Sequence, residues 1–223
     1  MKPYYQDATC TIYHGDCREI LPALSLGSVA LVTDPPYGIA HRSQRTSGGL
    51  FARWRNTEIA NDSDTACRDY ALAWASGCPA AVFGSRKIAE PEGTRTVLIW
   101  DKGPASGMGD LSIPWKPSWE EIYIIGDGWA GRRDEGVLKG HHVVTRECMG
   151  RKHPNEKPVS LLADIIRKAP PASTIVDPFM GSGTTLRAAK DLGRRAIGVE
   201  CDERYCEIAA KRLAQEVLLL GAG

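Results

Sequence analysis

The carboxyl-terminal part of the chain alternates between strand and helix patterns, and this alternation constrains the fold more than any other feature. Short apolar runs predict strands at 174–177 and 195–200, and helical periodicity predicts helices over 183–192 and 202–219. Similar runs earlier in the chain predict further strands at 11–14, 29–33, 80–83, 96–100 and 119–126. Earlier helices are expected over 17–24, 65–76 and 158–169. Such alternation indicates an α/β fold whose mostly parallel sheet has helices on both faces and binds ligands at the carboxyl ends of its strands.

Composition fits one domain of this kind and disfavours other classes. The 223 residues are 43% hydrophobic, which is enough for a sizeable core. No apolar run approaches the roughly 20 residues of a membrane helix, and the amino terminus has no apolar signal core, so we expect a cytoplasmic location. The seven cysteines include no C-x-x-C pair. We predict no metal site, because the candidate ligands are too loosely spaced: His141, His142, Cys148 and His153.

Two long segments follow neither the strand nor the helix pattern. Residues 38–62 are rich in Arg, Ser, Gly and Thr and too long for a tight connection, so we predict a mobile loop that serves as a lid. Residues 127–156 show no period and are predicted to form an irregular insertion. The net charge is only +1, but in the first segment Arg42, Arg45, Arg53 and Arg55 stand against Glu58. A basic loop of this kind is either a solvated face or a contact for a polyanion.

The sequence Asp34-Pro35-Pro36-Tyr37 follows the predicted strand at 29–33 and presents an acid and an aromatic ring. The two prolines fix φ and remove two amide donors, so the chain is stiff where Asp34 and Tyr37 leave the strand. A plain turn that ends a strand would explain the same residues. The functional alternative is a loop that positions two side chains for chemistry.

A second motif lies between a predicted strand and a helix: Asp177-Pro178-Phe179-Met180-Gly181-Ser182-Gly183-Thr184-Thr185. Its glycines allow the backbone to approach a ligand closely, and the helix start offers free amides to an anionic group. Glu200 ends the next strand about 20 residues further on, where an acid can bind the paired hydroxyls of a ribose. These residues indicate a nucleoside-containing cofactor.

Two other interpretations of this motif compete with a cofactor site. The motif lacks the third glycine of the dinucleotide fingerprint and the Gly-Lys-Ser/Thr of a P-loop, so a nucleoside triphosphate site is not expected. A glycine turn that only packs a helix on a strand is the structural alternative.

With both motifs in hand, the chain resembles the amino-directed DNA methyltransferases that use S-adenosylmethionine, in the permuted order of their β class. The box at Asp34 comes first, and His153-Pro154-Asn155-Glu156-Lys157-Pro158 precedes the glycine motif near the end. Weaker matches are Gly15-Asp16, Trp100-Asp101-Lys102-Gly103 and Ile197-Gly198-Val199-Glu200. The resemblance implies one catalytic domain over 1–223 with a seven-stranded sheet, one strand of which is antiparallel. It also implies that the strands entering Asp34 and Asp177 lie side by side.

The resemblance assigns chemistry to the first box. Asp34 and the carbonyl of Pro35, stiffened by Pro36, would accept the two hydrogens of an exocyclic amino group and so free its lone pair for attack on the sulfonium methyl. The target base would leave the duplex and stack on Tyr37. No metal and no covalent intermediate is required.

The resemblance also implies a cofactor site. It places the methionine end near Asp177 and the glycine turn, the ribose on Glu200 and the adenine near Asp16, with Lys157 closing the methionine side. The complete expected set is Asp16, Lys157, Asp177, Phe179, Gly181, Ser182, Gly183, Thr184, Thr185 and Glu200. Structural alternatives exist for three of them, because Asp16 and Glu200 suit helix caps and Lys157 suits a solvated charge.

The partner that the resemblance implies is double-stranded DNA, in a restriction-modification setting. Only 38–61 and a small target-recognition insertion at about 127–152 remain to read sequence, so the target is short or a homodimer supplies the rest. Candidate base readers are Arg132, Arg133 and Arg146. We favour N6 of adenine, because cytosine-directed relatives often carry Ser in place of Asp34. The alternatives are an N4-cytosine enzyme and a non-catalytic cofactor-binding module that serves a partner.

Overall fold

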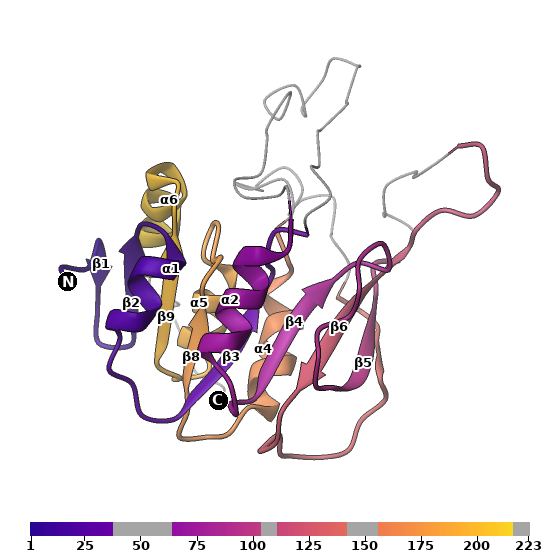
Figure 1. Cartoon of the computed structure of the whole chain (residues 1–223), viewed down its shortest axis with the longest axis horizontal. Helices are drawn as coiled ribbons and strands as arrows, with labels where there is room; N and C mark the ends of the chain where they lie inside the picture. The colour runs from indigo at the N-terminus through magenta and orange to yellow at the C-terminus, as the bar shows by residue number, and fades with distance from the viewer. Residues whose placement is uncertain (38–63, 104–110, 142–155, 216–223) are drawn as a thin grey trace, which may run out of the picture.

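A single sheet forms the centre of the molecule (Figure 1). The computed structural model describes residues 1–37, 64–103, 111–141 and 156–215. Within these residues the sheet has nine strands in the order β1-β2-β9-β8-β3-β4-β6-β5-β7. Their bounds are β1 Tyr5–Gln6, β2 Cys10–His14, β3 Val29–Thr33, β4 Ala80–Gly84, β5 Thr94–Asp101, β6 Trp119–Ile125, β7 Val137–Leu138, β8 Thr174–Asp177 and β9 Ala196–Glu200.

Strand directions confirm the mostly parallel sheet. The pairs β2–β9, β9–β8, β8–β3 and β3–β4 are all parallel, whereas β6 runs antiparallel to β4 and β5. All seven predicted strands are present near their expected bounds. The count of seven was too low, because β1 and β7 add one strand at each side, and β1 is a second antiparallel strand. Two-residue strands carry no periodic signal, which is why the sequence did not predict them.

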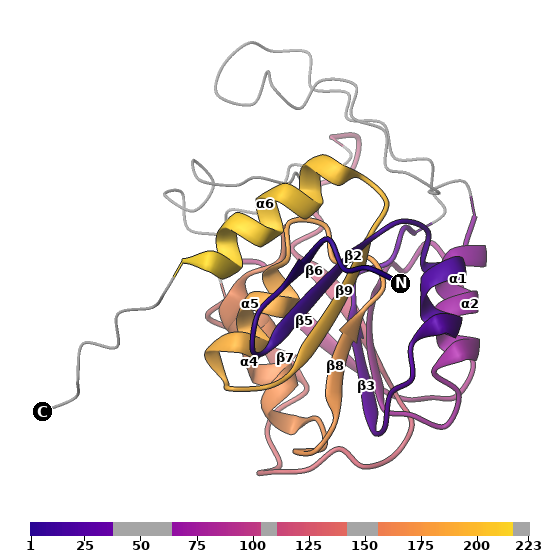
Figure 2. The same ribbon diagram turned by 90° about the vertical axis from the view of Figure 1, so that its left-hand side faces the viewer.

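Helices cover both faces of the sheet, as Figure 2 shows in edge view. One face carries α1 (Cys17–Ile20), the 3₁₀ turn η1 (Leu21–Ala23) and α2 (Ala66–Trp74), and the other carries α4 (Val159–Lys168), α5 (Thr184–Asp191) and α6 (Glu203–Ala214). The helix expected over 17–24 is therefore a short α-helix that continues as a 3₁₀ turn, where Pro22 has no amide to donate. The helix expected to reach 219 ends at Ala214, and 216–223 lie outside the described residues.

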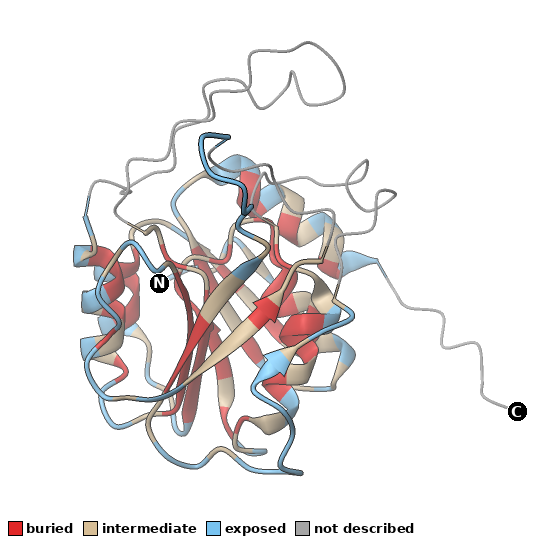
Figure 3. Ribbon diagram, turned by 90° about the vertical axis from the view of Figure 1, so that its right-hand side faces the viewer, coloured by how far each residue is buried: buried red, intermediate tan, exposed pale blue. Residues whose placement is uncertain are grey.

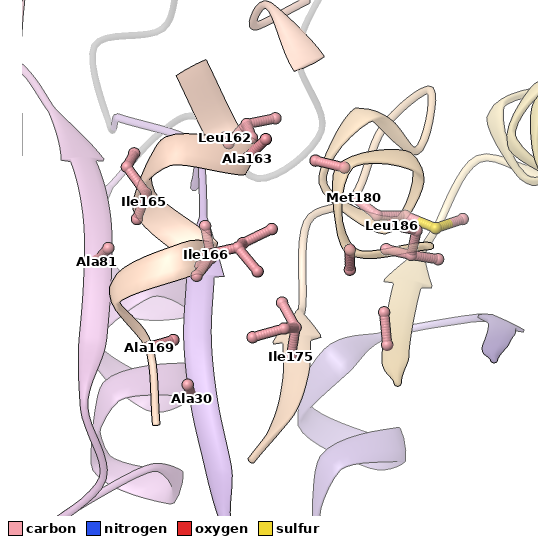
Figure 4. Close-up of a cluster of buried hydrophobic side chains, with 14 of the residues drawn as sticks. Ala30, Ala81, Leu162, Ala163, Ile165, Ile166, Ala169, Ile175, Met180 and Leu186 are labelled. Atoms are coloured by element: carbon pink, nitrogen blue, oxygen red, sulfur yellow. The ribbon is translucent and has the colours of Figure 1, made fainter. Parts of the chain in front are cut away.

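Two apolar clusters, one on each face, hold these layers together. All five residues of β3 are buried, which matches the continuous apolar run of a central parallel strand. On one face, Ile165 and Ile166 of α4 pack in a cluster with the small side chains of Ala30 and Ala81 on the strands (Figure 4). The other cluster joins α1 and α2 to the opposite face. Figure 3 shows the buried residues concentrated along the strands and the inner sides of the helices.

The segment after β6 departs from the expected irregular insertion in its described part, 127–141. It runs along the end of α4, where the amide of Ala130 donates to the carbonyl of Lys168 at 2.8 Å, and then forms β7. Because β8 begins just after α4 ends, the first part of this stretch lies at the amino edge of the parallel strands, whereas β7 pairs with Ile99 and Trp100 near the carboxyl end of β5. The expected loop at 38–62, most of the remaining insertion and Arg146 lie outside the described residues.

Within the described ranges, no helix has both the length and the apolar character that crossing a membrane requires. In the same ranges, no group of three or more His, Cys, Asp or Glu side chains is arranged to hold a metal ion.

Candidate active site

Acidic residues follow or end four strands that are neighbours in the sheet, β2, β9, β8 and β3. They are Asp16, Glu200, Asp177 and Asp34 in that order across the sheet. Carboxyl ends of parallel strands lie at one edge, so the four acids share the edge where α/β sheets bind ligands. The sequence predicted each of these residues separately, and the strand order brings them together.

The Asp34 loop begins where β3 ends, and it holds the acid and the ring against each other. The hydroxyl of Tyr37 donates to Asp34 Oδ1 at 2.6 Å, and Pro35 between them is buried. Burial and the neighbouring Asp34 raise the pKa of Tyr37 well above its usual value, so this hydroxyl remains a donor. The Asp34 side chain is 25% exposed, which leaves part of its carboxylate accessible. The loop therefore presents both predicted side chains from a fixed backbone.

Lys157, which is distant in the sequence, contacts this loop through Asp34. Its Nζ lies 2.8 Å from Asp34 Oδ2 and 2.9 Å from Glu120 Oε2, and its side chain is only 6% exposed. The same Nζ lies 4.9 Å from the centre of the Phe83 ring, within cation–π range. Lys157 is thus not the solvated charge that the sequence left open as an alternative. It is a buried cation between two carboxylates.

Glu120 and Lys102 extend this network, and sequence reasoning missed both. Lys102 Nζ lies 2.8 Å from Glu120 Oε1. Glu120 is the second residue of β6 and pairs with the buried Trp100 of β5, so its side chain points to the face that carries α4. The sequence shows two adjacent acids, Glu120 and Glu121, before an apolar run, and periodicity alone does not say which one points inward.

The charges in the network support one another. Although burial acts to raise it, Lys157 and Lys102 lower the pKa of Glu120 to about 2. Burial acts to lower the pKa of Lys157, but Asp34 and Glu120 raise it above the usual value. For Asp34, burial raises the pKa and outweighs the opposing effect of Lys157. The site therefore holds a permanent cation beside a carboxylate that accepts a proton more readily than a solvated one does.

Asp177 joins the two sequence motifs directly. Strands β3 and β8 are paired, as predicted, and Asp177 Oδ1 accepts a 2.6 Å hydrogen bond from the hydroxyl of Thr33, the residue before Asp34. The amide of Phe179 donates to the same oxygen at 3.1 Å. Asp177 is only 2% exposed, and burial raises its pKa to about 6. It therefore fastens the glycine turn to the end of β3 and presents little carboxylate surface to a ligand.

The glycine turn has the backbone that its sequence predicts. Gly181 and Gly183 have φ of 50° and 78°, the left-handed region that glycine adopts without strain. A Cβ on Gly183 would lie 2.7 Å from Cβ of Ala209 on α6, so close packing also requires glycine here. Phe179 and Gly181 are partly accessible, whereas most of the other expected cofactor residues here are buried: Ser182, Gly183, Thr184 and Thr185.

The carboxylates of Glu200 and Asp16 both accept hydrogen bonds from backbone amides. Glu200 Oε2 accepts from the amide of Gly181 at 3.0 Å, and Oε1 accepts from the amide of Asp202 at 2.8 Å. Burial raises the pKa of Glu200. Asp16 caps α1 by accepting from the amide of Arg18 at 2.8 Å. The structural alternative for Asp16 is therefore present. Asp202, rather than Glu200, is the N-cap of α6.

A second ion pair, also missed from the sequence, ties the segment before α4 to the glycine turn. Arg212 of α6 pairs with Glu156 at 2.7 Å and donates to the carbonyl of Ser182 at 2.8 Å. The hydroxyl of Ser182 donates to Glu156 at 2.9 Å. The residue next to Lys157 is thereby fixed to the turn that was expected to hold the cofactor. His153 and Asn155 lie outside the described residues.

Arg132 and Arg133 do not lie near this edge. Arg132 is 91% exposed and pairs with Asp134 at the amino edge of the parallel strands, beside Lys168. The four acids occupy the carboxyl edge. Arg132 therefore lies at the edge of the sheet opposite to Asp34.

The site as a whole suits a ligand with positive charge and hydroxyl groups. Glu200 and Phe179 both remain partly accessible, and Glu200 contacts the glycine turn through the amide of Gly181. Four carboxylates along one edge disfavour a polyphosphate, since like charges repel where the dielectric constant is low. A nucleoside that carries a cationic group fits this set of donors and acceptors better.

Comparisons with known proteins agree with this geometry. A family model described as DNA methylase matches residues 86–211. The type II methyltransferase M2.LlaDCHI of Lactococcus lactis subsp. cremoris is 28% identical over 247 aligned residues, covering 95% of this chain and 92% of that protein. The type II methyltransferase M2.DpnII of Streptococcus pneumoniae is 26% identical over 253, covering 96% and 93%.

Solved structures share the fold. The PvuII DNA methyltransferase, described as cytosine-N4-specific, matches with a TM-score of 0.65 and 19% identity over 97% of this chain and 90% of that one. A complex of M1.HpyAVI with SAM matches with a TM-score of 0.63 and 23% identity, over 91% of this chain and 99% of that one.

Proposed function

Since the chain belongs to the DNA methylase family of N6- and N4-amino methyltransferases, we propose that it transfers a methyl group from S-adenosylmethionine to N6 of adenine in double-stranded DNA. The observation that carries this proposal is the contact between Thr33 and Asp177. That hydrogen bond joins the neighbouring ends of β3 and β8, from which the Asp34 loop and the glycine turn begin, so the proposed base and cofactor sites would adjoin. The type II relatives further suggest a role in restriction-modification.

The cofactor assignment rests on the acidic edge and the turn. Glu200 would accept from ribose hydroxyls with the lone pairs that Gly181 and Asp202 leave free, and Phe179 offers an apolar surface. Asp177 would contribute by holding the turn, because its Oδ1 already accepts from Thr33 and Phe179. Asp16 stays a proposed neighbour of the adenine. When bound, S-adenosylmethionine supplies a methyl group already activated by its sulfonium. The SAM complex of M1.HpyAVI supports this choice.

Asp34 is the proposed contact to the amino group of the target base. A carboxylate has about four lone-pair sites, and Tyr37 and Lys157 occupy only some of them. Asp34 can therefore accept one amino hydrogen, while the Pro35 carbonyl accepts the other. These two acceptors bind the two amino hydrogens and reduce the delocalisation of the nitrogen lone pair into the ring. The lone pair is then available for attack on the methyl group. The Tyr37 ring would hold the flipped base by stacking, which is worth about 1 to 3 kcal/mol.

Cofactor binding can be tested apart from catalysis. Glu200→Gln keeps the shape of the side chain but removes its charge and one of its two acceptor oxygens for the amides of Gly181 and Asp202, so we expect about tenfold weaker binding of S-adenosylmethionine in calorimetry. Glu203→Gln, on the first turn of α6, is the matched control and should bind normally. Equal affinity in both variants would remove Glu200 from the cofactor site.

The base is identified by the product. Methyl-labelled S-adenosylmethionine is incubated with the protein and mixed-sequence DNA, and the DNA is digested to nucleosides. We expect label in N6-methyladenine. Label in N4-methylcytosine would show that the alternative within the family is correct. DNA that gains no label from any sequence, with cofactor binding intact, would leave only a non-catalytic binding module.

A further inference from the structure

Four charged side chains of alternating sign form a row that ends at the active-site acid: Lys102, Glu120, Lys157 and Asp34. Lys102 Nζ lies 2.8 Å from Glu120 Oε1, Lys157 Nζ lies 2.9 Å from Glu120 Oε2, and the same Nζ lies 2.8 Å from Asp34 Oδ2. Lys157 is buried, and the side chains of Lys102 and Glu120 are 23% and 22% exposed. Such a row is expensive to desolvate, and replacing buried charges by apolar residues is often neutral or stabilising. Fold stability alone therefore does not account for it.

We propose that Glu120 is a positioning residue of the methyl-transfer reaction, which acts on Asp34 through Lys157. This inference rests on the proposed function, because it concerns the same acid. Glu120 holds the Lys157 ammonium between two carboxylates and so limits how completely Lys157 neutralises Asp34. Asp34 then ionises less readily than it would beside Lys157 alone, but it is a stronger hydrogen-bond acceptor. Lys102 in turn limits how strongly Glu120 draws Lys157 away.

The groups that face each member define what a substitution changes. Asp34 faces Lys157 and the Tyr37 hydroxyl, with the charges of Glu120 and Asp177 also close enough to interact. Lys157 faces Asp34, Glu120, the Tyr37 hydroxyl and the Phe83 ring. Glu120 faces Lys157 and Lys102. Lys157 therefore acts on Asp34 directly, whereas Lys102 acts on it only through Glu120.

Two substitutions are expected to move the pH dependence of the reaction in opposite directions. In Glu120→Gln, Asp34 is the one remaining carboxylate among the described residues that pairs with Lys157. Asp34 therefore ionises more easily but is a weaker hydrogen-bond acceptor. The acid limb of the kcat profile should move down by on the order of one pH unit, and the plateau should fall roughly tenfold. Lys102→Met lets Glu120 attract Lys157 more strongly, so the acid limb should move up.

Controls separate this effect from a loss of packing. Glu121→Gln changes the adjacent acid of β6, whose carboxylate accepts from the hydroxyl of Tyr123 instead, and should leave the acid limb in place. Lys157→Met removes the central cation and should move the limb up further than Lys102→Met does. The proposal would be overturned if the acid limb of the kcat profile stayed fixed in both Glu120→Gln and Lys102→Met. It would also be overturned if the limb moved in the same direction in both variants.

A measurement without turnover distinguishes this inference from the proposed function. The ¹³C chemical shift of the Asp34 carboxyl, assigned with Asp34→Asn, is followed against pH in the wild type and in both variants. We expect the midpoint to fall in Glu120→Gln and to rise in Lys102→Met. Those shifts in a protein that methylates no DNA would reject the proposed function while supporting the coupling. Unchanged midpoints in an active enzyme would reject the coupling alone.

Discussion

Asp34 and Asp177 occupy equivalent places on neighbouring strands, yet their surroundings differ. Each follows or ends a buried parallel strand at the same edge of the sheet. Asp34 has a cation beside it, the Nζ of Lys157 at 2.8 Å. Asp177 has neutral donors, among them the hydroxyl of Thr33 and the amide of Phe179. Burial raises the pKa of both acids, and that of Asp177 to about 6.

This difference indicates that Asp34 has a chemical role and Asp177 a structural one. Asp34 lies beside a buried cation and keeps acceptor sites for a substrate, whereas neutral donors occupy the carboxylate of the buried Asp177. Asp34 also keeps 25% of its side chain accessible, against 2% for the whole of Asp177. We therefore expect substitutions at Asp34 to affect the reaction and substitutions at Asp177 to affect stability.

Removing the charge of Asp34 should have the largest effect. Asp34→Asn keeps the shape but no longer accepts with a full negative charge, so we expect methyl transfer to fall by roughly 10²- to 10⁴-fold. Asp34→Ala should abolish transfer. Affinity for S-adenosylmethionine, measured by calorimetry, should change little in either variant.

The matched control is Asp177→Asn, which should keep most of its activity at neutral pH. If the two asparagine variants lost activity to the same extent, the division between a chemical and a structural acid would be wrong. A loss of cofactor affinity in Asp34→Asn would instead move Asp34 to the cofactor site.

Tyr37 tests whether the ring or the hydroxyl supports Asp34. Tyr37→Ala loses the proposed stacking surface, which is worth about 1 to 3 kcal/mol, so transfer should fall by roughly 10- to 100-fold. Tyr37→Phe loses the donor to Asp34 Oδ1 and a 3.4 Å contact with Lys157 Nζ, and should cost a few-fold at most, with the acid limb of kcat at slightly higher pH. Steady-state rates on one DNA substrate measure both. A phenylalanine variant as slow as the alanine variant would show that the hydroxyl, not the ring, matters.

Much of this fold followed from the sequence because its signals are local. Apolar runs such as 29–33 and 174–177 specify buried parallel strands, and the glycines at 181 and 183 specify a left-handed turn. β1 and β7 have two residues each and depend on the neighbouring strand for their conformation. Such short edge strands leave no local sign in the sequence, so they were missed.

The residues of the site also fall into those with a local sequence signal and those without one. Asp34, Tyr37 and Asp177 lie in short motifs and were predicted, as was the pairing of their strands. Glu120, Lys102 and Arg212 were not, because their roles arise only from contacts between distant segments. Even for Asp177, the sequence predicted the place but not that Thr33 would occupy its carboxylate.

The raised pKa of Asp177 predicts a pH-dependent stability. A folded pKa of about 6 against an ordinary 3.8 means that the folded state binds the proton more tightly, so Asp177 stabilises the fold at low pH and loses that contribution as pH rises from about 4 to 6. The full difference is about 3 kcal/mol. Asp177→Asn removes it, so the variant should gain stability relative to the wild type as the pH of urea unfolding is raised through this window. A constant difference between the two proteins across the window would show that Asp177 does not titrate there.

Thr33→Val should have the smallest effect and addresses the hydrogen bond between the two strand ends. Valine keeps the β-branched shape of Thr33 within β3 but removes the hydroxyl that donates to Asp177, at a cost of about 1 kcal/mol. The cost should be greater above the pKa of Asp177 than below it, because an ionised carboxylate depends more on its donors than a protonated one does. In the Asp177→Asn background this pH dependence should vanish while a smaller constant cost remains. Urea unfolding of the four proteins on both sides of that pKa measures the coupling, and a cost of Thr33→Val that stays equally pH-dependent in the Asp177→Asn background would show that the hydroxyl acts on some other titrating group.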